Sequence, residues 1–117
     1  MANPEEQALV VKALLEGLSN AVEWNARAAD RITSAGEFTP DHVRRRLIEH
    51  VRRYGGDCVR QRRERRERWR DHFDYVYEVV IVPYEDLKRG LYVEMRLVDD
   101  DPDVPEVEIV NTHPQLG

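Results

Sequence analysis

Three side chains towards the C-terminus of this 117-residue chain have the chemistry that cleavage of RNA requires, namely Glu94, Arg96 and His113. A ribonuclease needs a base for the 2′-hydroxyl proton, an acid for the leaving oxygen and a cation beside the phosphate. Glu94, or Glu78 in its place, would be the base, His113 the acid and Arg96 the cation. The alternative is cross-strand pairing of Glu and Arg on an exposed sheet face. The pattern alone favours this alternative, because most half-exposed sheets carry such pairs.

A second group of side chains is suited to binding nucleic acid. Residues 60–70 contain seven arginines and one tryptophan, and two further arginines stand one helical turn apart near residue 30. Guanidinium groups pair with phosphates, and an indole ring can stack on a base. The alternative is a solvated surface on which Glu64 and Glu67 neutralise the arginines four positions before them. The candidate nucleic-acid-binding residues are Arg27, Arg31, Arg62, Arg63, Arg66 and Trp69.

Metal and cofactor chemistry find little support in the residue spacing. The four aspartates at residues 99–103 suggest a calcium loop, but such a loop needs Gly at its sixth position and Glu at its twelfth. Counted from Asp99, these positions are Val104 and Val110. The histidines and Cys58 have no zinc spacing, and no Gly-rich phosphate loop or nucleophile motif is present. We therefore expect no metal and no cofactor, and we interpret the aspartates as an acidic turn on which a basic partner could dock.

Composition indicates a single domain over residues 1–117. Hydrophobic residues make up 41% of the chain and charged residues 35%, which is enough for one packed core with a polar surface. No run approaches the roughly 20 apolar residues of a membrane span. Cys58 is the only cysteine, and the acidic N-terminus is unlike a signal peptide. These features predict a cytoplasmic protein without a membrane partner.

The net charge of −5 is unevenly distributed. Residues 1–73 carry 15 Lys and Arg against 12 Asp and Glu, whereas residues 74–117 carry 3 against 11. Two interpretations remain open: the two halves neutralise each other within one fold, or a partner carries a matching charge pattern.

Helical periodicity dominates the first half of the chain. Apolar residues recur at helical spacing between residues 10 and 18, after Pro4 and two glutamates that suit a helix N-terminus. This helix either continues to about Ser34 or breaks near residues 17–20, where Asn20 and Glu23 would form a new capping box.

The next helix has clearer boundaries. Thr39 is an N-cap residue, Pro40 stands at the first helical position, and Phe38 with Val43 would form a hydrophobic staple. Two glycines at residues 55–56 end the helix. Residues 57–73 are predicted equally well as a charged helix or as an extended segment that leads into a sheet.

The period changes to two from residue 75 onwards. Residues 75–82, 91–98 and 107–112 alternate as strands do, and breaker-rich segments separate them. The predicted fold class is α+β, with two to three N-terminal helices packed on a three- to four-stranded antiparallel meander. A short last strand would leave an open sheet edge, which favours a homodimer.

With its elements in this order, the chain resembles the RelE/ParE-type toxin superfamily and its uncharacterised relatives. Their helix motif His-Ala-x-x-Arg-Met is matched by Arg-Ala-Ala-Asp-Arg-Ile at residues 27–32, and the opening of their next helix by Phe-Thr-Pro-Asp-His-Val at residues 38–43. The last strand is matched at residues 109–114, so the resemblance covers about residues 22–114. Arg27 replaces the motif histidine, residues 33–37 form a longer connection, and the chain is more acidic than such toxins.

The resemblance implies an RNA-directed, ribosome-linked nuclease or a descendant that has lost catalysis. We therefore expect a toxin-like domain whose partners are RNA and a neutralising protein. The alternative is a non-catalytic interaction module, accessory or immunity-like, that docks through an acidic sheet edge. The net charge, the Asp-rich turn and the missing motif histidine favour this alternative.

Overall fold

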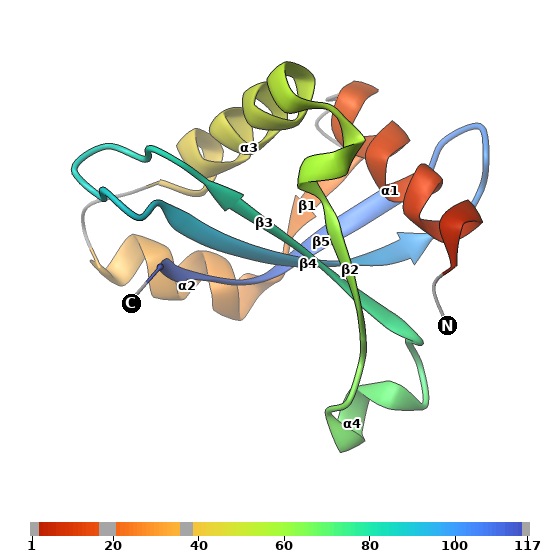
Figure 1. Ribbon diagram of the computed structural model, residues 1–117. Coiled ribbons are helices and arrows are strands. Elements are labelled where there is room, and N and C mark those ends of the chain that lie inside the picture. The colour runs from red at the N-terminus through yellow and green to blue at the C-terminus, as the bar shows by residue number, and fades with distance from the viewer. Residues whose placement is uncertain (1–2, 17–20, 36–38, 116–117) are drawn as a thin grey trace.

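Five strands form one sheet in the order β1-β5-β4-β3-β2. The computed structural model describes residues 3–16, 21–35 and 39–115. Helices α1 and α3 cover one face of the sheet, whereas α2 and the short α4 lie on its other side (Figure 1). The elements are α1 (Pro4–Glu16), β1 (Val22–Trp24), α2 (Ala26–Ala35), α3 (Pro40–Tyr54), the 3-10 turn η1 (Gly56–Cys58), β2 (Arg60–Arg63), α4 (Glu67–Arg70), β3 (Tyr75–Ile81), β4 (Leu91–Asp99) and β5 (Glu106–Pro114). The predicted α+β class is confirmed.

The sheet is mixed, so the prediction of a purely antiparallel meander is wrong. Strands β3, β4 and β5 do form the expected meander, and β2 extends it antiparallel to β3. The difference is β1, which we expected to be helical and which runs parallel to β5. The amide of Val107 donates to Ala21 O at 2.8 Å, and the amide of Asn25 donates to Ile109 O at 2.8 Å. These bonds satisfy the outer backbone of β5, which a helix at this position would have left unpaired.

Of the two alternatives for the N-terminal helix, the structure has the break, with a different cap. Helix α1 ends at Glu16, and α2 begins only after β1. Asn20, the expected cap, lies outside the described residues. Asn25 caps α2 instead, because its Oδ1 accepts from the amides of Arg27 at 3.1 Å and Ala28 at 3.4 Å.

Helix α3 follows its sequence signals closely. Thr39 Oγ1 accepts from the amide of His42 at 3.2 Å, Pro40 stands in the first turn, and Gly55 ends the helix with φ 79°. Phe38 of the expected staple lies outside the described residues.

Residues 57–73, for which two conformations were expected, contain both of them. η1 leads into β2, which is extended, and one turn of helix, α4, follows before β3. The amide of Glu64 donates to Asp74 O at 2.9 Å, so the pairing of β2 with β3 continues to the base of this excursion. Residues 64–74 therefore project from the sheet as an arm that carries α4 (Figure 1).

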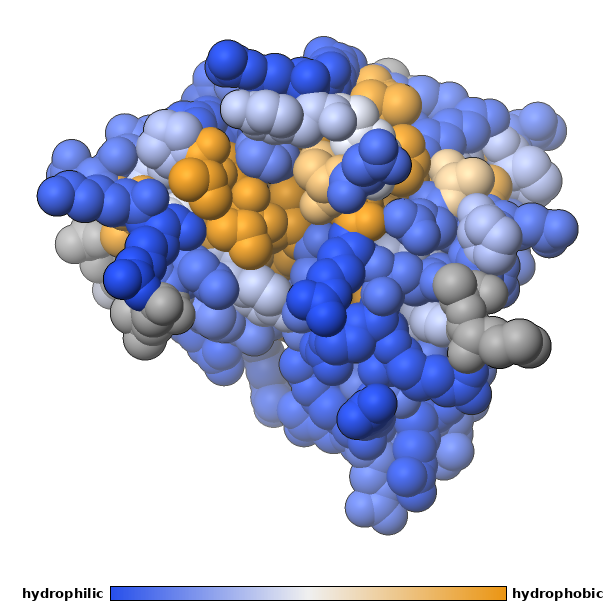
Figure 2. Space-filling model, viewed as in Figure 1, coloured by the Kyte–Doolittle hydropathy of each residue, from blue (hydrophilic) through white to orange (hydrophobic). Residues whose placement is uncertain are grey.

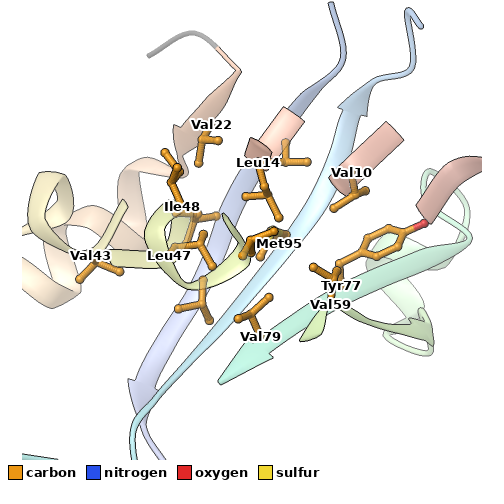
Figure 3. Close-up of a cluster of buried hydrophobic side chains, with 14 of the residues drawn as sticks. Val10, Leu14, Val22, Val43, Leu47, Ile48, Val59, Tyr77, Val79 and Met95 are labelled. Atoms are coloured by element: carbon orange, nitrogen blue, oxygen red, sulfur yellow. The ribbon is translucent and has the colours of Figure 1, made fainter. Parts of the chain in front are cut away.

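The hydrophobic core lies between the sheet and helices α1 and α3 (Figure 3). Alternate residues of β3, β4 and β5 point into it, as the period of two predicts. The fully buried side chains include Val10, Leu14, Val43, Leu47, Val51, Tyr77, Val93, Met95 and Ile109. The opposite sheet face, hereafter the second face, carries the polar residues of the same strands.

The argument for a homodimer through the last strand is wrong, because β5 lies between β1 and β4 and is not an edge. No helix among residues 3–16, 21–35 and 39–115 is long and apolar enough to cross a bilayer.

Candidate nucleic-acid interface

A cleft of about 370 Å³ opens on the second face between α2 and the arm that carries α4. Helix α2 supplies one wall, the arm supplies the other, and β4 and β5 supply the floor. The cleft is lined by five arginines, one carboxylate and two aromatic rings, with small residues of α2 and Val110 of β5 between them. These charged and aromatic residues are Arg27, Arg31, Arg66, Arg68, Arg96, Glu108, Trp69 and Phe73.

One arginine of the floor, Arg96, is fixed in a buried ion pair. It is 3% exposed, and it donates to Glu64 Oε2 from Nη2 at 2.7 Å and from Nε at 3.2 Å. Its guanidinium lies 4.7 Å from the centroid of Trp69 and 5.5 Å from that of Phe73. Burial alone would raise the pKa of Glu64, but the hydrogen bonds from Arg96 and from the Arg66 amide lower it below its usual range. This pair ties the arm to the sheet.

A second buried carboxylate, Glu94, neutralises arginines beside the cleft. Arg66 Nη2 donates to Glu94 Oε1 at 2.9 Å, while its Nη1 lies 2.8 Å from Oε2 without hydrogen-bond geometry. Arg62 Nη2 donates to Oε1 at 3.3 Å and its Nε lies 3.3 Å from Glu78. The hydroxyl of Tyr92 lies 2.5 Å from Glu78 Oε2 and 2.9 Å from Glu94 Oε1, so its single proton can be donated to either carboxylate. Burial, and then these two carboxylates, raise the pKa of Tyr92 far above its usual range, so the hydroxyl keeps its proton.

Three arginines of the cleft keep their charge uncompensated. Arg27, Arg31 and Arg68 are exposed, and no carboxylate of the described residues lies within ion-pair distance of them. Arg31 donates to Asn111 Oδ1 at 3.4 Å, and Arg68 lies 5.5 Å from the centroid of Trp69. The cleft therefore presents local positive charge although the whole chain is acidic, and it suits an anionic ligand.

Two of the three residues predicted to be catalytic are engaged in ion pairs. Glu94 and Arg96 both point to the second face, yet each is engaged by oppositely charged side chains. His113 is exposed and stacks on Tyr92 with ring centroids 4.7 Å apart. Glu94 instead contacts the hydroxyl of the same tyrosine. Glu94 and Arg96 thus have the structural role that the alternative of cross-strand ion pairing describes, with partners on β2 and the arm.

Four of the six predicted nucleic-acid-binding residues line the cleft: Arg27, Arg31, Arg66 and Trp69. Arg62 lies beside the cleft, where it holds Glu78 and Glu94. Arg63 points to the opposite face of β2 and lies 5.7 Å from the centroid of Tyr75. This separation follows from the alternation of side chains along a strand.

Sequence reasoning missed Arg68, Phe73 and Glu108 as cleft residues. The first two stand in or next to the Arg-rich run, but only the turn at α4 shows which of its side chains face α2. Glu108 faces Arg96 across the β4–β5 ladder. It is the single carboxylate among the described residues that line the cleft.

The acidic turn does not form a sheet edge. Residues 100–105 join β4 and β5, which are interior strands, whereas the sheet edges are β1 and the arginine-rich β2. Asp99 Oδ1 accepts from the amide of Asp101 at 3.0 Å, and Asp101 Oδ1 accepts from that of Asp103 at 2.9 Å. Two of the aspartates therefore stabilise the turn itself. Among the described residues, no group of three or more His, Cys, Asp and Glu is arranged to hold a metal ion.

No protein-family model, curated protein or solved structure matches this chain.

Proposed function

We propose that this protein is an RNA-directed, toxin-like domain that binds single-stranded RNA in the cleft between α2 and α4. The observation that carries the proposal is the convergence of Arg27, Arg31 and Arg68, none with a carboxylate partner in the described structure, on a cleft that also holds Trp69. Exposed guanidinium groups bind phosphates, and an aromatic ring beside them binds an unstacked base.

The ligand of the cleft is a single strand because its bases must reach an aromatic ring. Trp69 is covered by buried Arg96 and by exposed Arg68. A base that stacks on Trp69 displaces Arg68, which has no ion pair to lose and can turn to a phosphate. Arg96 stays in place because Glu64 holds it. Paired bases in a duplex cannot make this contact.

Binding is better supported than cleavage. General acid–base catalysis requires groups that reach the ribose and the leaving oxygen. Glu94 is 1% exposed and engaged by Arg62, Arg66 and Tyr92, so it does not offer a free base at the surface. A cleaving form of the protein would have to use Glu108 in the cleft or His113 beside it.

The first test is the affinity for a fluorescein-labelled, unstructured RNA, measured by fluorescence anisotropy over a range of salt concentrations. Each free arginine that contacts a phosphate contributes about 0.7 to the slope of log K against log salt for a single strand. Arg27→Gln, Arg31→Gln and Arg68→Gln should each weaken binding and reduce that slope. Arg65→Gln and Arg70→Gln are matched controls, because both arginines are exposed in the same run but do not line the cleft.

Equal loss of affinity in the cleft variants and in the controls would refute the cleft as the binding site. The same RNA, incubated with the protein and separated on a denaturing gel, tests cleavage. Intact RNA is expected. Cleavage that His113→Ala abolishes while binding persists would restore the ribonuclease hypothesis, and growth arrest of the expressing host would support the toxin-like assignment in either case.

A further inference from the structure

One edge of the sheet is only partly covered. Strand β2 pairs with β3 from Tyr75 to Glu78 and then ends, because the chain before Arg60 turns away into η1. Residues 79–81 of β3 pair with β4 on their other side, but no strand of the described chain pairs with them on the side of β2. The C-terminal part of β3 is therefore an open edge next to α3.

The backbone groups that face this edge can be identified. The amide of Glu64 donates to Asp74 O, so Asp74 directs its backbone towards β2. Backbone direction alternates along a strand, and Val80 therefore faces the same side. No strand of the described residues pairs with Val80 on this side, because the pairing with β2 ends at Glu78. Exposed edge groups of this kind are a template for an added strand.

An apolar surface adjoins the open edge. Figure 2 shows apolar side chains below α3, over the C-terminal end of β3, with hydrophilic side chains around them. Val82 is 43% exposed and Tyr54, at the end of α3, is 53% exposed. Between them lies a hollow of about 170 Å³, lined also by Pro83, His50, Arg46, Glu49 and Arg53. Arg46 and Glu49 form an ion pair at 3.9 Å, so Arg53 carries the net positive charge of the hollow. An added strand would bury alternate apolar side chains against this surface.

The positive charge beside the open edge of β3 favours an acidic partner over a second copy of this chain. Helix α3 carries five arginines against Asp41 and Glu49, and Arg53, on the hollow, has no carboxylate partner among the described residues. A second copy paired edge to edge across a two-fold axis would bring two such helices together, and their like charges would repel. An acidic partner gains attraction instead.

We infer that the open edge of β3 is the docking site for an extended, acidic segment of a different protein, which pairs with Val80 as an additional strand. Apolar residues at alternate positions of the segment contact Val82 and Tyr54, and its carboxylates face Arg53. The site is separate from the cleft and its existence does not depend on RNA binding.

A peptide library displayed on phage tests this inference without a known partner. The library is selected on the wild-type protein and counter-selected on Val80→Pro, which removes the outward amide and is tolerated at a sheet edge. Selected peptides should be rich in Asp and Glu that alternate with apolar residues. A synthetic peptide of the selected sequence should bind Val80→Pro at least about tenfold more weakly than it binds wild type, and Val80→Ala, which keeps the amide, is the matched control.

A second variant keeps the test valid if Val80→Pro unfolds the protein. Arg53→Glu should weaken the same peptide about tenfold, whereas Arg45→Glu, on the same helix but away from the hollow, should not. Amide chemical shifts in the NMR spectrum should change at residues 79–82 on addition of peptide and stay constant at Arg27 and Arg31.

Three results would overturn the inference. The first is that the selected peptides have no excess of acidic residues. The second is that the peptide binds the wild type, Val80→Pro and Arg53→Glu with equal affinity. The third is a wild-type dimer in sedimentation analysis that Val80→Pro converts to monomer, since this would identify a second copy as the occupant. Loss of RNA binding in the cleft variants leaves all these outcomes unchanged, so the two proposals fail independently.

Discussion

Replacement of Glu64 by glutamine removes the anion that holds the arm to the sheet. Glu64 Oε2 accepts two hydrogen bonds from Arg96, and Oε1 accepts from the Arg66 amide at 2.9 Å. The side chains of Glu64 and Arg96 are 1% and 3% exposed, so solvent does not screen them. In Glu64→Gln the guanidinium of Arg96 stays buried and charged with only a neutral acceptor beside it.

Loss of one partner from a buried ion pair costs about 3–5 kcal/mol. The rings of Trp69 and Phe73 remain against Arg96 and retain part of its stabilisation, since a desolvated cation–π contact contributes up to about 2 kcal/mol. We therefore expect Glu64→Gln to lower the free energy of unfolding by about 3 kcal/mol, the lower end of that range. This is a large part of the roughly 5–15 kcal/mol that stabilises an ordinary domain.

The effect should depend on pH in one direction. The pKa of Glu64 is lowered in the folded protein, so its stabilisation is present above the usual carboxyl pKa and is lost as the pH falls through the folded pKa. The difference between wild type and Glu64→Gln should consequently shrink from about pH 7 to about pH 3.

Urea denaturation at several pH values measures this difference. Glu67→Gln is the matched control, because Glu67 is exposed and forms no ion pair with the described residues, and it should change stability by less than about 0.5 kcal/mol. Adding Arg96→Met to Glu64→Gln should recover much of the loss, because an apolar side chain leaves no buried charge. A loss below about 1 kcal/mol, or one that grows in acid, would refute the role assigned to the pair.

Three further outcomes follow from individual contacts. Gly90 has φ 87°, and a Cβ there would lie 2.4 Å from Ile81 O. Gly90→Ala should therefore lower the free energy of unfolding by at least about 2 kcal/mol, which thermal denaturation would show as a lower melting temperature. Asn25→Ala removes the cap of α2 and should cost about 1 kcal/mol in urea denaturation, with Asn25→Asp close to wild type. Burial raises the pKa of the Cys58 thiol, so iodoacetamide should alkylate it more slowly than free cysteine at neutral pH. An alkylation rate equal to that of free cysteine would contradict this last expectation.

The elements that were predicted correctly depend on local interactions. Thr39, Pro40 and Gly55 act on the backbone within a few residues of themselves, and the alternation of β3, β4 and β5 reflects one face against a core. Strand β1 depends instead on pairing between residues 22–24 and 107–109. Three residues are too few for a periodic signal, and their partner is more than eighty positions away.

The same distinction explains the outcome for the site. The interleaved glutamates of the Arg-rich run suggested that Glu64 pairs with Arg60, which is correct only if the segment is one continuous helix. Because residues 60–63 are extended, Glu64 reaches Arg96 while Arg60 lies 4.0 Å from Glu78. The residue types therefore predicted which side chains form ion pairs in this run. The pairing of β2 with β3 determines which arginine each carboxylate contacts.

If the proposed function is correct, the number of free arginines in the cleft, and not the total number of arginines, sets how strongly the protein binds RNA. Seven phosphate contacts from residues 60–70 would give a salt slope of about −5 for a single strand, at about 0.7 per contact. Only Arg66 and Arg68 of these seven arginines line the cleft, and Arg66 is neutralised by Glu94. Together with Arg27 and Arg31 of α2, Arg68 leaves three uncompensated arginines in the cleft, which give a slope of only about −2. An acidic chain can thus present a basic cleft, because the buried carboxylates of Glu64 and Glu94 form ion pairs with Arg96 and Arg66. The positive charge left for a ligand is small and local, and α2 and the arm fix its position.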